Sequence, residues 1–121
     1  MGLKVLVAED NLINQKVAMI NLKKLGHDVE IAVNGQMAVD MYKSGSYDVV
    51  LMDIQMPILD GLEATVAIRN YEHDNHLDRV KIVAITANAL NEDKEKCFDV
   101  GMDEYITKPI QTDELKRVLE L

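Results

Sequence analysis

Cysteine is almost absent from this sequence, because Cys97 is the only one in 121 residues. A disulfide framework is therefore excluded, and we expect a reducing compartment. Cys97 falls on the apolar side of a predicted helix, where we expect an inert core residue. Aromatic residues make up only 4% of the chain, whereas methionine occurs seven times. We expect these methionines to fill gaps in the core.

Long hydrophobic runs are also missing. No apolar stretch approaches the roughly 20 residues that a membrane-spanning helix needs. The first residues lack the layout of a signal peptide, and Leu6 stands where a myristoylation pattern needs Ser or Thr. We therefore expect a cytoplasmic protein with no membrane partner.

Basic residues are too few to balance the acidic ones. Thirteen Lys and Arg oppose 21 Asp and Glu, which gives a formal net charge of -8 at pH 7. Direct binding to nucleic acid is therefore not expected, while a cation or a partner with a basic surface suits the charge. No linker, repeat or low-complexity segment divides the chain. We expect a single domain over residues 1–121, without an output domain.

Apolar runs and helical periodicity alternate along the chain. Strands are predicted at residues 3–8, 28–33, 48–53, 81–86 and 103–107. Helices are predicted from the cap Asn11 to about 25, at 35–44, after the cap Asp60, at 91–100 and from about 112. In the first helix, Ile13, Val17 and Ile20 share one face. The polar stretch 70–79 predicts a loop, or a frayed helix end followed by a loop.

Five strands alternating with five helices predict an α/β fold with a doubly wound, five-stranded parallel sheet. Chain length and element count favour the flavodoxin-like (βα)5 order 2-1-3-4-5 over a larger Rossmann sheet. All carboxyl ends then lie at one edge of the sheet. The first and third strands are neighbours at the switch point, and the fourth strand follows the third.

Polar side chains occupy four of these strand ends. Glu9 and Asp10 follow the first strand, and Asp53 ends the third, which is otherwise an unbroken apolar run. Thr86 ends the fourth strand, and Lys108 follows the fifth. We therefore expect three carboxylates to converge, flanked by a hydroxyl and an ammonium group.

This combination has a specific chemistry. Clustered carboxylates repel one another, and a hard divalent cation with oxygen ligands, such as Mg²⁺, removes that penalty. A carboxylate can act as a nucleophile and become an aspartyl phosphate. The cation and the ammonium group can then screen the charge on the transferring phosphoryl group. The sequence thus predicts a phosphoryl-accepting site.

Other polar residues favour structural roles. His73 and His76 lie in a polar stretch without a thiol or further histidine nearby, so a metal site is not expected there. His27 follows Gly26 and is interpreted as a solvated turn residue. Taken alone, Asp53, Thr86 and Tyr105 would also have ordinary structural interpretations, as two strand-end polar residues and a packed aromatic.

Taken together, the motifs resemble the receiver domains of two-component response regulators, and the resemblance covers the whole chain. They are Glu9-Asp10, Asp53 with Met56-Pro57 and Asp60-Gly61, Thr86-Ala87, and Lys108-Pro109. Each motif alone is weak evidence of the family, but all of them in this order are highly specific. The run from residue 9 to residue 15 is most similar to the receivers of hybrid sensor histidine kinases.

The resemblance implies a role for each residue of the acidic site. Asp53 would be the phosphoacceptor, and Lys108 would pair with the phosphoryl group. Mg²⁺ would be bound directly by Asp10, Asp53 and the backbone carbonyl of Gln55. Glu9 would bind the ion largely through water.

The resemblance also implies residues that transmit and time the signal. Thr86 would be the switch hydroxyl, and Tyr105 the aromatic residue that changes rotamer with it. Ala87 would contribute to phosphoryl binding. Gln55 and Asn88 fall where the family tunes the lifetime of the phosphoryl group. In this family the bond before the proline, here Lys108-Pro109, is commonly cis.

Partners follow from the same resemblance. A sensor histidine kinase or a histidine phosphotransfer domain would donate the phosphoryl group in a phosphorelay. The surface formed by the helix at 91–100, the strand at 103–107 and the last helix would then meet a downstream protein. Phosphotransfer and autodephosphorylation would be self-directed, so a turnover enzyme is not expected.

Two alternative functions remain open. An aspartyl-phosphate phosphatase of the dehalogenase type also uses Asp and Mg²⁺, but that family needs a second Asp two residues after the nucleophile. Gln55 occupies this position here. A phosphate-independent interaction module with the same fold generally lacks part of the acidic set, which is complete in this chain.

Overall fold

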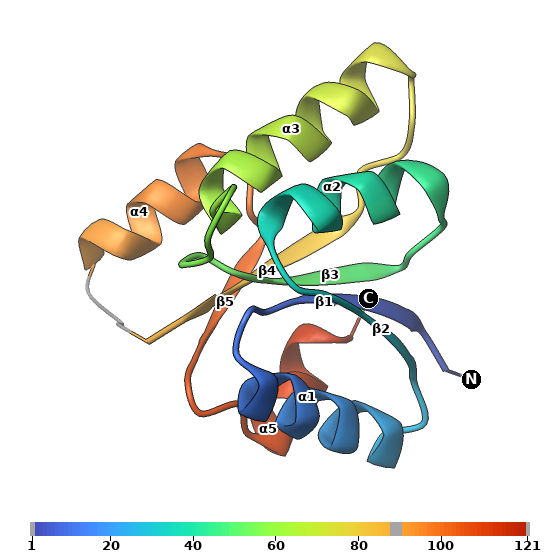
Figure 1. Ribbon diagram of the computed structural model, residues 1–121, viewed down its shortest axis with the longest axis vertical. Coiled ribbons are helices and arrows are strands. Elements are labelled where there is room, and N and C mark those ends of the chain that lie inside the picture. Colours follow the sequence, from blue (N-terminus) through green and yellow to red (C-terminus); the bar gives the residue numbers. More distant parts are fainter. Residues whose placement is uncertain (1, 88–90, 121) are drawn as a thin grey trace.

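The computed structural model describes residues 2–87 and 91–120, and strands and helices alternate along it (Figure 1). The strands are β1 (Lys4–Ala8), β2 (Asp28–Ala32), β3 (Val49–Asp53), β4 (Lys81–Thr86) and β5 (Glu104–Thr107). The helices are α1 (Leu12–Lys24), α2 (Gly35–Ser44), α3 (Gly61–Asp74), α4 (Asn91–Asp99) and α5 (Thr112–Val118). Apart from α3, their ends lie close to the predicted ones.

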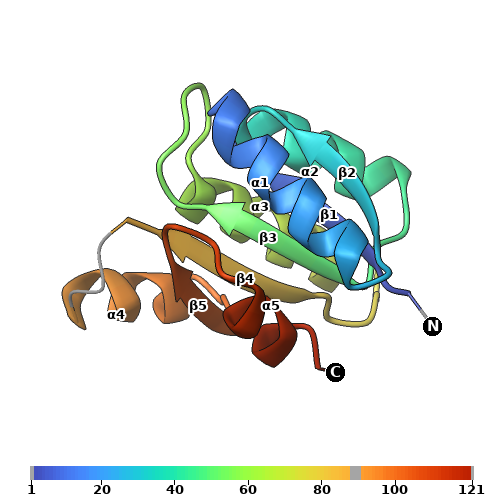
Figure 2. The same cartoon turned by 90° about the horizontal axis from the view of Figure 1, so that it is seen from below.

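The five strands are parallel and form one sheet in the order β2-β1-β3-β4-β5. Helices α1 and α5 cover one face, and α2, α3 and α4 cover the other (Figures 1 and 2). The predicted fold class, a doubly wound flavodoxin-like sheet, is confirmed. Since every strand runs the same way, all carboxyl ends lie at one edge.

The sheet separates two hydrophobic cores. All five residues of β3 are buried, because this strand lies centrally and is covered on both faces. Leu6, Val50 and Met52 pack in the core under α2, α3 and α4, which also contains Cys97. Val7 and its neighbours pack in the core under α1 and α5. Cys97 is buried, as expected.

Helix α1 does not pack through the face that Ile13 and Ile20 mark. Ala18 and Leu22 are its buried residues, whereas Ile13 and Ile20 have exposed fractions of 71% and 58%. Helical spacing therefore predicted the helix, but on the face that it suggested only Val17 is half-buried.

Helix α3 extends into the polar stretch for which a loop, or a frayed helix end, was predicted. The helix continues to Asp74, so residues 70–74 are regular helix. Glu72 is buried in this part, where it accepts a hydrogen bond from Arg69 at 2.7 Å and one from the Tyr42 hydroxyl at 2.9 Å. Partnered polar groups can be buried without a large penalty, which explains why a polar sequence packs here.

Helix ends follow the predicted caps. The side chains of Asn11 and Asp60 accept the backbone N–H groups of Asn14 and Glu63 at the starts of α1 and α3. The half-buried His27 accepts a hydrogen bond from the backbone N–H of Leu3 through Nδ1, which gives it a structural role in the turn. No helix in the described part of the chain is long and apolar enough to cross a membrane.

Candidate functional site

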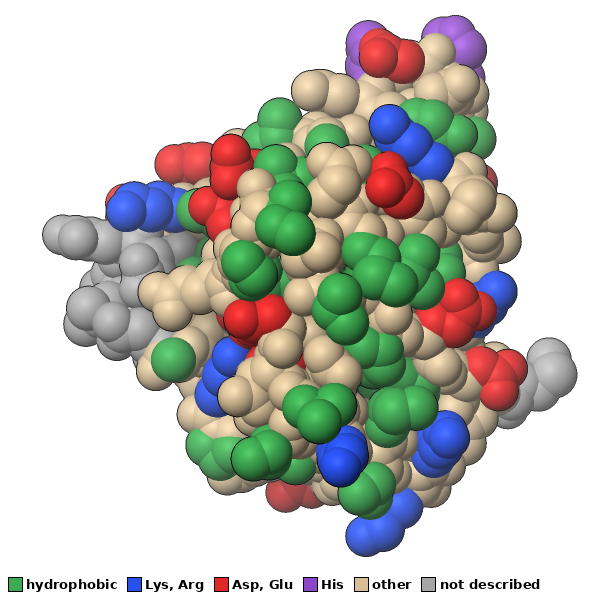
Figure 3. Space-filling view, viewed as in Figure 1, with side chains coloured by type: hydrophobic (Ala, Val, Ile, Leu, Met, Phe, Trp, Pro, Cys, Tyr) green, Lys and Arg blue, Asp and Glu red, His purple; other side chains and the backbone are tan. Residues whose placement is uncertain are grey.

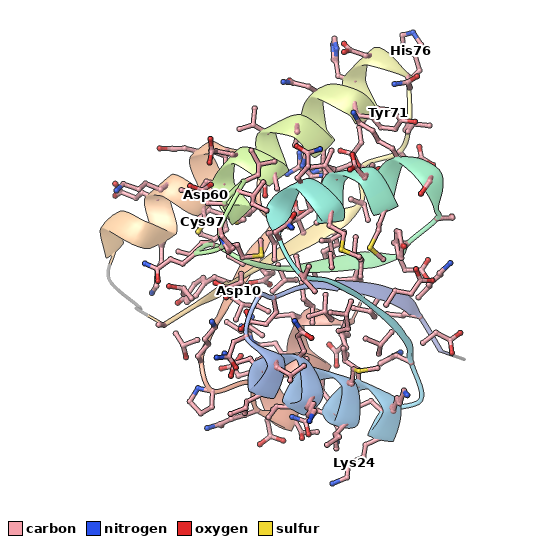
Figure 4. The ribbon with its side chains drawn as sticks, in the orientation of Figure 1. Asp10, Lys24, Asp60, Tyr71, His76 and Cys97 are labelled. Carbon is pink, nitrogen blue, oxygen red and sulfur yellow. The ribbon has the colours of Figure 1, made fainter. Side chains whose placement is uncertain are left out.

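The register of the sheet brings the first and third strand ends together. Ala8 of β1 pairs with Met52 of β3, so the next residues, Glu9 and Asp53, leave the sheet side by side. Asp10 follows where the chain turns from β1 into α1 (Figure 4). The two segments are adjacent only because the chain order reverses at this point of the sheet.

The carboxylates of Glu9, Asp10 and Asp53 form the acidic cluster. One oxygen from each lies within 4.8 Å of the others, and no other group of this kind occurs among the described residues. Glu9 and Asp53 are each 2% exposed, whereas Asp10 is exposed. The cluster therefore has a buried base and an open side, where a ligand can enter.

Lys108 supplies the positive charge of the site. Its Nζ donates to Asp53 Oδ2 at 2.7 Å and lies 3.5 Å from Glu9 Oε1. The backbone N–H of Lys108 donates to the Thr86 carbonyl at 2.9 Å, which places this residue directly beside the end of β4. The Lys108-Pro109 peptide bond is cis, as predicted.

The charged groups change one another's protonation. Burial, together with the neighbouring Asp53 carboxylate, raises the pKa of Glu9 from 4.5 to about 7. Burial opposes the charged form of Lys108, but Asp53 and Glu9 outweigh it and raise the pKa of this ammonium group. Lys108 is therefore fully protonated at neutral pH, and Glu9 is held near its midpoint.

Two amide side chains that sequence reasoning missed hold Glu9. Asn14 Nδ2 donates to Glu9 Oε1 at 2.7 Å, and Gln15 Nε2 donates to the Glu9 carbonyl at 2.7 Å. The other carboxylate oxygen, Oε2, is buried and has no hydrogen-bond partner among the described residues. A polar residue in a first helical turn is too common a signal to have identified these contacts from the sequence.

The loop after Asp53 is held close to the acidic cluster. The backbone N–H of Gln55 donates to Asp53 Oδ1 at 3.0 Å, and that of Gly61 donates to the Ile54 carbonyl at 3.2 Å. A Cβ atom at Gly61 would collide with the carbonyl oxygen of Asp53. Glycine is therefore required for the close approach of α3 to the end of β3.

The predicted switch residues lie on the neighbouring strands. Thr86 is 3% exposed at the end of β4, and Ala87 beyond it is exposed. Tyr105 is half-buried on β5, with its ring 6.4 Å from that of Phe98 in an edge-to-face arrangement and 4.4 Å from Lys94 Nζ. Asn88, for which a role in phosphoryl lifetime was predicted, lies outside the described residues.

The acidic cluster fits a small hard cation. Three carboxylates offer oxygen ligands, and the unpartnered Glu9 Oε2 is a buried group of the kind that a cation or its water satisfies. The histidines do not compete for this role. His73 and His76 are both exposed, and histidine side chains are visible on the surface in Figure 3. Figure 4 shows His76 far from Asp10 of the cluster.

Comparison with solved structures shows the same architecture in signalling proteins. The receiver domain of a sensor histidine kinase from Pseudomonas aeruginosa PAO1, which holds a magnesium ion in its active-site cleft, is 42% identical with a TM-score of 0.88. This match covers 99% of the chain and 96% of that structure. The receiver domain of Saccharomyces cerevisiae Ssk1, co-crystallised with the histidine phosphotransfer protein Ypd1, is 36% identical with a TM-score of 0.91. It covers 96% of the chain and 85% of that structure.

Sequence comparison gives the same family. Hybrid signal transduction histidine kinase I of Dictyostelium discoideum is 51% identical over 121 residues, which cover 96% of the chain and 7% of that protein. The curated relatives are long proteins, of which the chain spans 5–15%. The family described as "Response regulator receiver domain" matches residues 5–120. The chain therefore belongs to the response regulator receiver domain family.

Proposed function

We propose that this domain is a phosphoacceptor switch of a two-component phosphorelay, in which Asp53 receives a phosphoryl group from a phosphohistidine. The contact between Asp53 and Lys108, inside an acidic cluster at the sheet edge, carries the proposal. An isolated strand-end aspartate would need neither the half-buried ammonium partner nor two further carboxylates. We propose residues 1–121 as one functional unit, with a cytoplasmic location.

The transfer step can be written from the chain's own residues. One carboxylate oxygen of Asp53 attacks the phosphorus, the P–N bond to the donor imidazole breaks, and an acyl phosphate forms. The imidazole nitrogen keeps the bonding electron pair and takes up a proton. Lys108, already beside Asp53 Oδ2, balances negative charge on the phosphoryl oxygens.

The acidic residues would hold Mg²⁺ beside the acceptor. Asp10, Asp53 and the Gln55 backbone carbonyl would bind it directly, and Glu9 would act through water. When bound, the ion supplies positive charge that offsets repulsion between the acceptor and the phosphoryl oxygens. Ala87 would contribute to phosphoryl binding, while Gln55 and Asn88 would affect the lifetime of the acyl phosphate.

The output would pass through the face of α4, β5 and α5. Thr86 and Lys108 are joined through the backbone at the ends of β4 and β5, so a new anion at Asp53 acts on both strands. Tyr105 lies on β5, and its ring contacts Phe98 and Lys94 of α4. A change at Thr86 would therefore bias the position of Tyr105 and alter the surface offered to a downstream protein.

A protein donor explains the apolar residues exposed beside the acceptor. Leu12 and Ile13 begin α1, shortly after Glu9 and Asp10, and are 63% and 71% exposed. Ile58, in the loop after Asp53, is 81% exposed and has a positive φ of 71°, which is unfavourable for a β-branched residue. A small phosphodonor needs none of these side chains. A histidine phosphotransfer domain or a kinase would bury them.

The experiment supplies the domain with Mg²⁺ and a small acyl phosphate, and measures intact mass. The parent should gain one phosphoryl group, and Asp53→Asn should gain none. Asp60→Asn is the matched control, because Asn caps a helix as well as Asp and this variant should be phosphorylated normally. A parent without an adduct would overturn the proposal, and an adduct on Asp53→Asn would move the acceptor elsewhere.

Catalytic turnover distinguishes the phosphoacceptor switch from the phosphatase alternative. We propose that the domain catalyses only its own phosphorylation and dephosphorylation, because Gln55 occupies the position where a phosphatase of the dehalogenase type has its acid-base Asp. Sustained release of phosphate from added phosphate esters would favour the phosphatase. If the domain forms no phosphoryl adduct but still binds a partner protein normally, the phosphate-independent interaction module is favoured.

A further inference from the structure

The first turn of α1 is tied to the end of β1 by side-chain amides. Asn14 Nδ2 donates to Glu9 Oε1, and Gln15 Nε2 donates to the Glu9 carbonyl, both at 2.7 Å. The backbone N–H of Asn14 donates to the N-cap oxygen of Asn11 at 3.0 Å, which fixes the position of Asn14 in the turn. The amide of Asn14 is therefore held where it meets the carboxylate.

This amide makes the two oxygens of Glu9 unequal. Oε1 accepts from Asn14 and lies near Lys108 Nζ, whereas Oε2 is buried with no hydrogen-bond partner among the described residues. A buried carboxylate oxygen without a donor is unfavourable unless a cation or an ordered water satisfies it. The orientation set by Asn14 thus leaves one Glu9 oxygen available to the acidic cluster.

We infer that Asn14 is a positioning residue of the cation site: its side-chain amide orients the Glu9 carboxylate and thereby strengthens the binding of Mg²⁺. The inference rests on the proposed function, since it assumes that the acidic cluster binds this ion. Hydrogen bonds that hold the groups around a metal ion in place commonly change its affinity by about 10- to 100-fold, and we expect the lower end here because Glu9 would act through water. Asn is also a weak helix former, so helix stability alone does not favour it at this position.

The test measures Mg²⁺ affinity without any phosphodonor. Two-dimensional NMR follows the backbone amide of Gln55, which donates to Asp53, during titration with MgCl₂. Asn14→Leu keeps a similar side-chain size but removes the amide donor. We expect its apparent dissociation constant for Mg²⁺ to rise about tenfold relative to the parent.

Asn21→Leu is the matched control. Asn21 lies on the same helix, is also half-buried, and donates through its amide to the Ile110 carbonyl at 3.4 Å. It is two turns further along the helix, roughly 10 Å from Asn14. The same substitution there should leave Mg²⁺ affinity unchanged. Asn14→Ala, which favours helix formation, replaces Asn14→Leu if the latter gives no folded spectrum.

A double-mutant cycle distinguishes positioning from a merely structural effect. If Asn14 acts through Glu9, then Asn14→Leu should have little further effect on Mg²⁺ affinity in a Glu9→Gln background. If Asn14→Leu weakens Mg²⁺ binding as strongly in the Glu9→Gln background as in the parent, the inference is overturned. It is also overturned if the folded Asn14→Leu single variant binds Mg²⁺ with the parent's affinity. A parent that binds no Mg²⁺ would overturn both this inference and the proposed cation site. Whether Asp53 is the phosphoacceptor is tested separately, by the intact-mass measurement of its phosphorylation.

Discussion

Lys108 Nζ lies 2.7 Å from Asp53 Oδ2, although the two residues are 55 positions apart in the chain. Their side chains meet because β3 and β5 flank β4 and all three strands end at the same edge. The pair is largely buried, with side-chain exposures of 25% for Lys108 and 3% for Asp53. It links the proposed acceptor to the strand that carries the proposed output.

Removal of this ammonium group should mainly impair phosphorylation. We expect Lys108→Met to slow the formation of the Asp53 adduct by about 100-fold, since one preorganised charge on the developing anion is lost. The rate is measured by intact mass after addition of Mg²⁺ and a small phosphodonor. Lys116→Met, at an exposed position of α5, is the control and should react at the parent rate. An equal rate for both variants would contradict the role of Lys108.

The protonation of Glu9 predicts how stability depends on pH without metal. Its pKa rises from 4.5 to about 7 on folding, so the folded state binds the proton more tightly. The corresponding stabilisation is fully present below about pH 4.5 and is lost as pH rises through 7, with an upper limit of about 3 kcal/mol. Denaturant unfolding in EDTA should show that the parent loses stability relative to Glu9→Gln between pH 5 and 8. A constant difference would contradict this prediction.

The ion pairs of α3 predict a stability effect away from the site. The Arg69 guanidinium pairs with Glu72 at 2.7 Å and with Asp103 at 2.8 Å, and its side chain is only 13% exposed. Arg69→Met should reduce the free energy of unfolding by about 3 kcal/mol or more, because buried Glu72 loses its counter-charge.

Arg79 provides the control for this prediction. It also pairs with Asp103 at 2.8 Å but is 56% exposed, so Arg79→Met should cost less than about 1 kcal/mol. Both free energies come from urea unfolding. Equal losses for the two variants would show that burial of the Arg69–Glu72 pair is not the cause.

The exposed start of α1 predicts a difference between phosphodonors. Ile13→Ser should slow transfer from a phosphorylated histidine phosphotransfer protein by about tenfold, since an apolar contact at an interface is lost. Transfer from a small acyl phosphate should be unchanged. Ile20→Ser changes another exposed residue of the same helix, two turns further from the acceptor, and should have the smaller effect. Equal rates for the parent and Ile13→Ser would exclude this face from the donor interface.

The sequence alone was sufficient for the architecture and for the main members of the site. A fully apolar strand ending in Asp53, within regular alternation of strands and helices, predicts a parallel sheet with a polar edge. That topology requires Glu9, Asp10 and Asp53 to converge, and it places Lys108 nearby, whatever the packing details. The structure confirms this arrangement. The chemical roles of all the site residues, including those of Thr86, Tyr105 and Asn88, stay predictions.

Only the tertiary structure decided contacts that depend on which side chains face each other. Periodicity marked Ile13 and Ile20 as one face of α1, but the helix packs through Ala18 and Leu22. The polar end of α3 packs as a helix because buried Glu72 has partners in Arg69 and in Tyr42, which is 30 positions away. The hydrogen bond from the Asn14 side chain to Glu9 likewise depends on how α1 is oriented relative to β1, and the local sequence does not specify this orientation. Strand order follows from a repeating pattern, whereas these polar pairings require the positions of particular atoms in the folded chain.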